Sequence, residues 1–279
     1  MSFALTGLDN KVAVVTGAGR MRSIGRAIAL TLARAGCDVV VTGSGRSPES
    51  YPDEEKEAGW RDIESVADQI RALGRRALPV VSNVADPAAV EALAEQVATA
   101  FGRCDFIVNN AGSTRGPDRI PVVDLPPEEW RKVVDINLNG VFYMCRAFAQ
   151  RMISQGDGGA IINISTIGSR LLAPTTAAYA TSKLAVNGLS TVLAAELGQY
   201  GIRVNVVAPG LVDTSRMDDM GRGETWNRYV QGRIALGRAG TGDDIADMVA
   251  FLCSDQAGWV TGQTIFVDGG QGSSPLRRR

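Results

Sequence analysis

The sequence predicts a single α/β domain in which helices cover both faces of a parallel, doubly wound sheet. Seven short runs rich in valine and isoleucine alternate with helix-like segments along most of the 279 residues. The runs are almost continuously apolar, which is typical of strands that are covered on both faces. Strands that alternate with helices are joined by right-handed crossovers, and such crossovers produce a parallel sheet.

The predicted elements follow one another without a break. Strands are expected at residues 11–16, 38–42, 76–82, 105–110, 160–165, 203–208 and 264–268, and helices at 24–35, 60–73, 87–101, 127–152, 176–200 and 242–253. Asp86 before Pro87, and Thr241 before an acidic first turn, are typical of helix starts. Because no proline-rich or charged linker divides Lys11 from Asp268, residues 1–279 are interpreted as one domain.

The balance of acidic and basic residues argues against polyanionic binding partners. The chain has 29 basic and 30 acidic residues, so its net charge of −1 gives no reason to expect nucleic acid or anionic lipid. No apolar window of about 18 residues and no signal-peptide pattern are present, so we expect a cytoplasmic protein without a membrane span. The arginines at 277–279 are interpreted as a solvated tail.

The cysteine and histidine content limits the kinds of metal site and catalytic site that the chain can form. The cysteines, at 37, 104, 145 and 253, lack the spacing of a zinc site or a redox pair, and buried free thiols are expected. Histidine is absent, which excludes Ser-His-Asp triads and makes a metal site unexpected. Any proton transfer near neutral pH must therefore use another side chain.

The first strand runs into a glycine loop, "VAVVTGAGRMRSIGRAIA", residues 12–29, with Gly17, Gly19 and Gly25. A strand, a glycine loop and a helix in this order place backbone N–H groups and the positive end of a helix where a pyrophosphate can bind. A turn that only reverses the chain direction is the alternative.

The end of the second strand, "VVVTGSGRS" at residues 39–47, lacks the acidic side chain that would accept hydrogen bonds from a ribose 2′-hydroxyl. Asp38 lies at the other end of that strand. Gly43, Ser44 and Arg46 lie at the strand end instead, with Arg20 and Arg22 in the opposite loop. This pattern favours a 2′-phosphate and hence NADP. Solvated surface arginines are the alternative, with NAD as the cofactor.

Tyr179 and Lys183 lie four residues apart in "AAYATSKLAV", so both side chains are on the same face of a helix. An ammonium near a phenol stabilises the phenolate, and the pair can transfer a proton without histidine. A half-buried tyrosine beside a solvated lysine is the plainer alternative.

Six ordered motifs resemble those of the short-chain dehydrogenase/reductase family. They are "TGAGRMRSIG", "NNAG" at 109–112, Asn137 in "DINLNGVF", "INIST" at 162–166, "YATSK" and "NVVAPGLVDT" at 205–214. The closing segment 236–270 continues the similarity, which covers about residues 9–270. The resemblance implies a seven-stranded Rossmann sheet and reversible hydride transfer between a nicotinamide and a carbonyl or alcohol carbon.

The resemblance also implies the catalytic residues. Tyr179 corresponds to the general acid/base, and Lys183 to the residue that assists it and holds the nicotinamide ribose. Asn137 would position a water in the proton relay. The family's substrate-binding serine falls on Thr166, although the side-chain type suggests Ser165. We assign the role to Thr166, because threonine supplies the same O–H donor and neighbouring strand residues face opposite ways.

Further cofactor contacts are implied at positions spread over six segments. Asn83 and Val84 match the adenine contacts, and residues 209–212 match the nicotinamide pocket. The full expected set is Gly17, Gly19, Arg20, Arg22, Ser23, Ile24, Gly25, Gly43, Ser44, Arg46, Asn83, Val84, Asn110, Ala111, Gly112, Tyr179, Lys183, Pro209, Gly210, Val212 and Thr214.

Two departures from the family pattern concern the adenosine side. The glycine loop is two residues longer, with Ser23 at the middle glycine's position and a bulge expected around Met21 and Arg22. The segment 43–66 is also longer than the usual link between strand and helix. It is expected either to fold over the adenosine or to be a solvated insertion.

Residues 211–232 are interpreted as a mobile lid over the substrate. Met217, Met220, Trp226 and Tyr229, with Leu171 and Leu172 opposite, predict a largely apolar pocket, and ordinary loop packing is the alternative.

The expected activity is NAD(P)-dependent oxidation or reduction of a small alcohol or ketone, similar to a 3-oxoacyl reductase or an alcohol dehydrogenase. An NAD-preferring alcohol dehydrogenase and a non-catalytic cofactor-binding sensor are the alternatives. The resemblance implies a homotetramer or homodimer, in which helices 127–152 and 176–200 would supply one interface.

Overall fold

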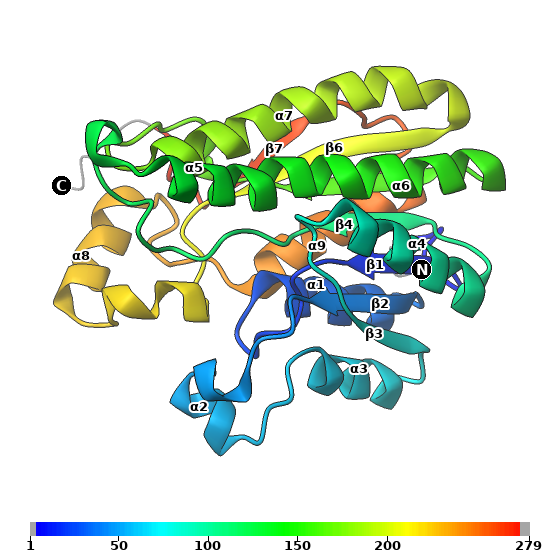
Figure 1. Ribbon diagram of the computed structural model, residues 1–279, viewed down its shortest axis with the longest axis horizontal. Coiled ribbons are helices and arrows are strands. Elements are labelled where there is room, and N and C mark those ends of the chain that lie inside the picture. The colour runs from blue at the N-terminus through cyan, green and yellow to red at the C-terminus, as the bar shows by residue number, and fades with distance from the viewer. Residues whose placement is uncertain (1–3, 274–279) are drawn as a thin grey trace.

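The computed structural model describes residues 4–273 and contains one parallel sheet of seven strands (Figure 1). The strand order is β3-β2-β1-β4-β5-β6-β7, and every neighbouring pair is parallel. The strands are β1 (Val12–Val15), β2 (Asp38–Gly43), β3 (Ala77–Val81), β4 (Phe106–Asn109), β5 (Gly159–Ile164), β6 (Ile202–Pro209) and β7 (Thr264–Val267). The predicted fold class is therefore confirmed, with the order of strands reversing between β1 and β4.

Helices cover the two faces of the sheet. One apolar layer joins α1 (Ile24–Arg34), α3 (Ile63–Ala72) and α9 (Gly242–Cys253), and the other joins α4 (Pro87–Phe101), α6 (Gly140–Gln155) and α7 (Ala177–Leu197). Within β1, Ala13 and Val15 belong to the first layer and Val12 and Val14 to the second. Alternate residues of a strand point to opposite faces, and both faces here are apolar.

The predicted helix at 127–152 has an irregular centre. It consists of α5 (Pro127–Val134), a π-helical turn (Asp135–Asn139) and α6. Such single π turns inside α-helices are frequent at functional sites. The predicted helix at 60–73 begins only at Ile63, because Asp62 before it has a φ of 52°. A positive φ is incompatible with a right-handed helix.

Two short helices, α2 (Asp53–Glu57) and α8 (Glu224–Arg233), lie toward the same end of the molecule, at the left in Figure 1. The 3-10 helices are Pro48–Ser50, Val122–Asp124, Ile167–Ser169, Gly198–Tyr200, Ser215–Met220 and Asp255–Ala257. The predicted helix starts are confirmed: the Asp86 side chain caps α4, and Thr241 forms a capping box with Asp244 at α9.

The four cysteines are buried and free, as expected. Burial raises the pKa of both Cys37 and Cys145 to about 12, so these thiols stay protonated at neutral pH. Within residues 4–273, no helix has the length and apolar character that crossing a membrane requires. The predicted arginine tail lies outside the described residues.

Candidate active site

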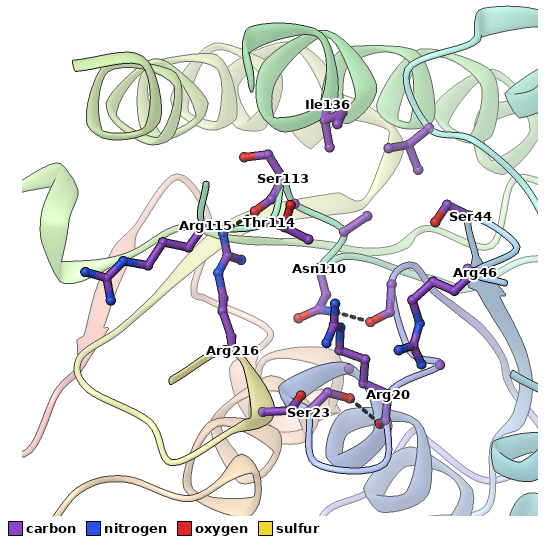
Figure 2. A pocket seen from close by; sticks show the side chains of 18 of the residues that line it. Arg20, Ser23, Ser44, Arg46, Asn110, Ser113, Thr114, Arg115, Ile136 and Arg216 are labelled. Carbon is purple, nitrogen blue, oxygen red and sulfur yellow. Dashed lines mark hydrogen bonds between the residues drawn. The ribbon is translucent and has the colours of Figure 1, made fainter. Parts of the chain in front are cut away.

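A cavity of about 550 Å³ lies where the carboxyl ends of β1, β2 and β4 meet (Figure 2). Ligands of open parallel sheets bind at this edge, next to the point where the strand order reverses. Most of the predicted cofactor residues line it: Gly17, Gly19, Arg20, Arg22, Ser23, Ile24, Gly25, Gly43, Ser44, Arg46, Asn83, Val84, Asn110, Ala111, Gly112 and Thr214.

The glycine loop is packed so closely that side chains are excluded at two positions. A Cβ on Gly17 would lie 2.8 Å from Cα of Ala111, and a Cβ on Gly25 would lie 2.6 Å from the Gly17 carbonyl oxygen. Gly17 also has a φ of 66°. The Asn110 side-chain amide donates to the Gly17 carbonyl at 3.0 Å. The loop is thereby held in place from the end of β4.

Ser23 replaces the family's middle glycine and begins α1. Its Oγ accepts from the backbone N–H of Arg26 at 3.2 Å and donates to the Arg20 carbonyl at 2.9 Å. The hydroxyl therefore satisfies an N–H of the first turn, and the positive end of α1 faces the cavity.

The two extra loop residues bind neighbouring segments. The Met21 N–H donates to Oε1 of the buried Glu55 at 2.8 Å, and the Arg22 carbonyl accepts from the N–H of Ser215 at 3.0 Å. The Arg22 guanidinium forms ion pairs with three carboxylates, on Glu54, Asp213 and Asp218. The predicted bulge thus connects the glycine loop to α2 and to the lid segment.

The long segment 43–66 folds against the glycine loop, so its interpretation as a solvated insertion is wrong. Glu55 is fully buried, and Nε1 of Trp60 donates to the Gly19 carbonyl at 2.7 Å. Arg46 stacks on the ring of Tyr51, with Cζ 4.6 Å from the ring centroid. In a solvated insertion, these side chains would contact water instead of the glycine loop and one another.

The same segment places a carboxylate beside the end of β2, which sequence reasoning missed. Asp62 lines the cavity, and its Oδ2 lies 3.2 Å from where a Cβ on Gly43 would be. Its Oδ1 accepts from Arg46 at 2.7 Å, whereas Oδ2 accepts no hydrogen bond from residues 4–273. Asp62 is 37 residues beyond Gly25, and only the tertiary fold brings it to this position.

The predicted arginines differ in their partners. Arg46 is neutralised by Asp62 and by Glu55 at 3.0 Å, and Arg22 by its three carboxylates. Arg20 points into the cavity (Figure 2) and forms no ion pair with residues 4–273. Burial and the nearby Arg46 lower the pKa of Arg20. Of the three guanidinium groups predicted to face a 2′-phosphate, one therefore lacks a carboxylate partner.

Lys183 and Tyr179 lie in α7, next to the end of β5. Lys183 is buried, and its Nζ donates to the Ile164 carbonyl at 2.8 Å. Burial, together with the charge of Arg216, lowers the pKa of Lys183 to about 7. The interpretation of Lys183 as a solvated lysine is thus excluded, because its side chain is turned into the protein.

Asn137 lies in the π-helical turn, and its side chain is fully buried. Its Oδ1 accepts from the Ser113 N–H at 2.8 Å, and its Nδ2 donates to Oγ of Ser182 at 3.1 Å. A Cβ on Gly112, which lines the cavity, would lie 3.3 Å from Asn137 Oδ1 and 3.8 Å from Lys183 Nζ. Asn137 and Lys183 therefore lie together directly behind the cavity wall.

Ser165 and Thr166 have different roles at the end of β5. The buried Ser165 hydroxyl donates to the Lys183 carbonyl at 3.1 Å. The half-buried Thr166 hydroxyl accepts from the Gly168 N–H at 3.1 Å, and among residues 4–273 its proton has no acceptor. The Ser165 proton is therefore used within the protein, whereas the Thr166 proton has no acceptor among the described residues.

Five of the predicted cofactor residues do not line the cavity: Tyr179, Lys183, Pro209, Gly210 and Val212. The Val212 side chain is buried in the apolar core, and Gly210 packs against Asp268. Tyr179 is half-buried, and two arginines that sequence reasoning missed, Arg119 and Arg216, lie over its ring.

The apolar side chains of the predicted lid do not face the cavity. Met217 and Met220 pack against a small cluster formed by Trp226, Val230 and Ile234, and none of these residues lines the cavity. The Tyr229 hydroxyl accepts from Gln271 at 3.0 Å. Ordinary packing within the segment accounts for the positions of these side chains, whereas Leu171 and Leu172 are exposed. The apolar substrate pocket therefore stays a prediction.

The doubly wound sheet and its glycine-lined cavity define a dinucleotide-binding α/β protein. A family model described as enoyl-(acyl carrier protein) reductase matches residues 17–271. The 3-oxoacyl-(acyl-carrier-protein) reductase of Staphylococcus aureus is 38% identical over 260 residues, which cover 93% of this chain and 97% of that protein. The chain therefore belongs to the short-chain dehydrogenase/reductase family.

Two other proteins are similar over nearly their whole length. L-rhamnose 1-dehydrogenase (NAD(P)(+)) of Azotobacter vinelandii is 39% identical, and the match covers 94% of this chain and 97% of that protein. A gluconate 5-dehydrogenase of Burkholderia cenocepacia, solved in complex with NADP and tartrate, superposes with a TM-score of 0.82 at 35% identity. That match covers 95% of this chain and 96% of the solved chain.

The burial of Lys183 predicts a pH-dependent stability. Its pKa is about 7 in the folded chain and 10.5 in the reference state, so unfolding takes up a proton between these values. Below pH 7 the folded protein carries the full free-energy cost of burying a charged lysine. This cost decreases as the pH rises above 7, because the buried lysine loses its proton. From pH 7 to 8.5, the free energy of unfolding of the wild type should rise relative to Lys183→Met by about 1–2 kcal/mol.

Urea unfolding of both cofactor-free proteins across this range measures the difference. The thiols are common to both proteins, so their titration cancels in the comparison. Parallel curves for the two proteins would show that folding does not lower the pKa of Lys183.

Proposed function

We propose that this protein is an NAD(P)-dependent oxidoreductase that converts a secondary alcohol to a ketone, or the reverse, with Tyr179 as the general acid/base. The observation that carries the proposal is the buried Lys183, whose ammonium lies one helical turn from Tyr179 and directly behind the wall of a glycine-lined cavity. In this proposal, the ammonium supplies positive charge on the face of α7 that carries the phenol.

Three features of the cavity are suited to binding a dinucleotide. The glycines at 17 and 25 allow a close backbone approach, the N-terminus of α1 faces the cavity, and polar strand ends line it. The similar L-rhamnose dehydrogenase is named for NAD(P)(+), and the similar gluconate 5-dehydrogenase is solved in complex with NADP. When bound, the nicotinamide ring supplies a reversible acceptor for hydride.

The residues of the chain would move the proton and orient the substrate. In the oxidative direction, the Tyr179 oxygen would accept the proton of the carbinol hydroxyl. The Thr166 hydroxyl, whose proton has no acceptor among residues 4–273, donates to the substrate oxygen. Asn137 holds the Ser113 N–H and the Ser182 hydroxyl, and so fixes the cavity wall against α7.

The structure favours NAD over NADP in this proposal. The sequence pattern alone favours NADP, but two of its three arginines are neutralised by carboxylates. Oδ2 of Asp62 lies where a carboxylate at the end of β2 would lie, and it is free to accept hydrogen bonds from ribose hydroxyls. A 2′-phosphate at this position would be repelled by the carboxylate.

Assembly and location stay predictions. Phe142 on α6, and Leu184 and Val192 on α7, are large apolar side chains exposed on the helices expected to form an interface. They support a homodimer or homotetramer. The cytoplasmic location and the absence of nucleic-acid and membrane partners rest on the composition alone.

Replacing Tyr179 by Phe removes the proton donor and keeps the ring on which Arg119 stacks. We expect kcat to fall by about 10²–10⁴-fold, because general acid/base catalysis contributes that much. The affinity for the preferred cofactor, measured by fluorescence titration, should stay nearly unchanged. Turnover of a panel of secondary alcohols at the wild-type rate in this variant would refute the role of Tyr179. No turnover of any panel member by the wild type, despite cofactor binding, would favour the sensor alternative.

Replacing Asp62 by Asn removes the carboxylate charge and keeps its shape. We expect the ratio of kcat/KM for NAD to that for NADP to fall by at least about tenfold, because charge-assisted hydrogen bonds to the ribose are lost and repulsion of the phosphate is relieved. Asp53→Asn, in the same segment but exposed, outside the cavity and paired with no arginine of residues 4–273, is the matched control and should leave the ratio unchanged. A wild type that prefers NADP, and loses this preference in Arg20→Ala or Arg46→Ala, would support the arginine interpretation instead.

A further inference from the structure

Two arginines from separate segments lie over the ring of Tyr179. Arg119 belongs to the loop after β4, and its Cζ is 4.2 Å from the ring centroid. Arg216 belongs to the 3-10 helix of the lid, and its Cζ is 5.5 Å from the same centroid. Guanidinium groups stack favourably on aromatic rings at these distances. Two cations therefore lie beside the residue proposed to exchange a proton with the substrate.

The positive charge around Tyr179 is not fully balanced. Arg115 pairs with Asp219 at 2.9 Å, and Nε of Arg119 lies 3.3 Å from Asp118. Arg216 forms no ion pair with any carboxylate of residues 4–273 and donates instead to the Ser113 carbonyl, as Figure 2 shows. Three guanidinium groups thus face two carboxylates, with the Lys183 ammonium close behind.

One of these guanidinium groups faces a carboxylate without forming a hydrogen bond to it. The Arg119 side chain is 19% exposed, and its Nε–H makes no hydrogen bond within the described part of the chain. Nε lies 3.3 Å from Oδ2 of the buried Asp118, and the two terminal amino groups of Arg119 donate no hydrogen bond to residues 4–273. These amino groups are the donors that a bound anion would use. A guanidinium binds a carboxylate through two parallel hydrogen bonds, which makes this anion a well-matched ligand.

We propose that Arg119, assisted by Arg216, binds a carboxylate of the substrate, so that the substrates are small hydroxy acids and the corresponding oxo acids. This inference rests on the proposed function. The stacking distance places the anion close to the reacting carbon, because Arg119 lies directly against the ring of Tyr179. Of the apolar side chains expected to bind the substrate, Met217, Met220 and Trp226 pack within their own segment, and Leu171 and Leu172 are exposed. The side chains that lie over the ring of Tyr179 are cationic.

The test compares substrates that differ only in the anion. A series of 2-hydroxy and 3-hydroxy acids of four to eight carbons is assayed beside their methyl esters with the preferred cofactor. The wild type should show a higher kcat/KM for the acid of each pair that is turned over. In Arg119→Met the ratio of kcat/KM for the acid to that for its ester should fall by about 10- to 100-fold, the effect of a charge-assisted hydrogen-bond pair. Arg119→Lys should restore part of the preference.

A second measurement does not depend on turnover. Malonate should stabilise the complex of the wild type with the oxidised cofactor in a thermal-shift titration, whereas malonamide should not, and Arg119→Met should abolish the malonate effect. Arg76→Met is the matched control, because Arg76 stacks on Phe101 with Cζ 4.3 Å from the ring centroid and precedes β3, at the other end of the sheet. It should behave as the wild type in both assays.

The outcomes separate this inference from the proposed function. Equal or better use of the esters by the wild type, with turnover intact, would overturn the carboxylate site alone. A weaker affinity for the cofactor in Arg119→Met would also overturn it, because Arg119 would then bind the cofactor. Selective malonate binding without turnover of any alcohol would retain the anion site and reject the oxidoreductase.

Discussion

The hydrogen bond from the buried Lys183 ammonium to the Ile164 carbonyl is the interaction on which the candidate site depends. Ile164 is the last residue of β5, so this bond ties α7 to the edge of the sheet where all parallel strands end. The bond from the Ser165 hydroxyl to the Lys183 carbonyl strengthens the same attachment. Because helix periodicity places Tyr179 on the same face of α7, fixing Lys183 also fixes the direction of the phenol.

Charge pairing organises the adenosine side in a comparable way. The buried Glu55 accepts from the Met21 N–H and from Arg46, and Arg22 bridges carboxylates of α2 and of the lid segment. A buried carboxylate is tolerated only where hydrogen bonds satisfy it, and the longer glycine loop supplies one of these bonds. The loop extension and the 43–66 segment therefore depend on each other: the first provides an N–H donor, and the second provides its acceptor.

The local patterns of the sequence predict the elements well and their tertiary contacts poorly. Apolar runs locate all seven strands, and Asp86 before Pro87 locates the start of α4, because these signals are contained within a few residues. The π-helical turn around Asn137 has no such signal, since one wider turn leaves the apolar pattern on both sides intact. Asp62, Arg119 and Arg216 reach the site through folding over long sequence separations, so spacing alone does not reveal them. The side chains of Met217 and Trp226 are correctly identified as apolar, but the sequence does not show which way they face.

The cationic wall beside Tyr179 has consequences for the proton chemistry as well as for binding. Arg216 contributes to the lowered pKa of Lys183, and burial lowers the pKa of Arg119 itself. Both effects show positive charge held in a poorly solvated region, where electrostatic interactions are stronger than in water. An anion bound between these cations would reduce their mutual repulsion and favour the protonated lysine. In the proposed mechanism, occupation of the site by a carboxylate and protonation of Lys183 are therefore linked, so that the charge of the substrate would influence the lysine proposed to assist Tyr179.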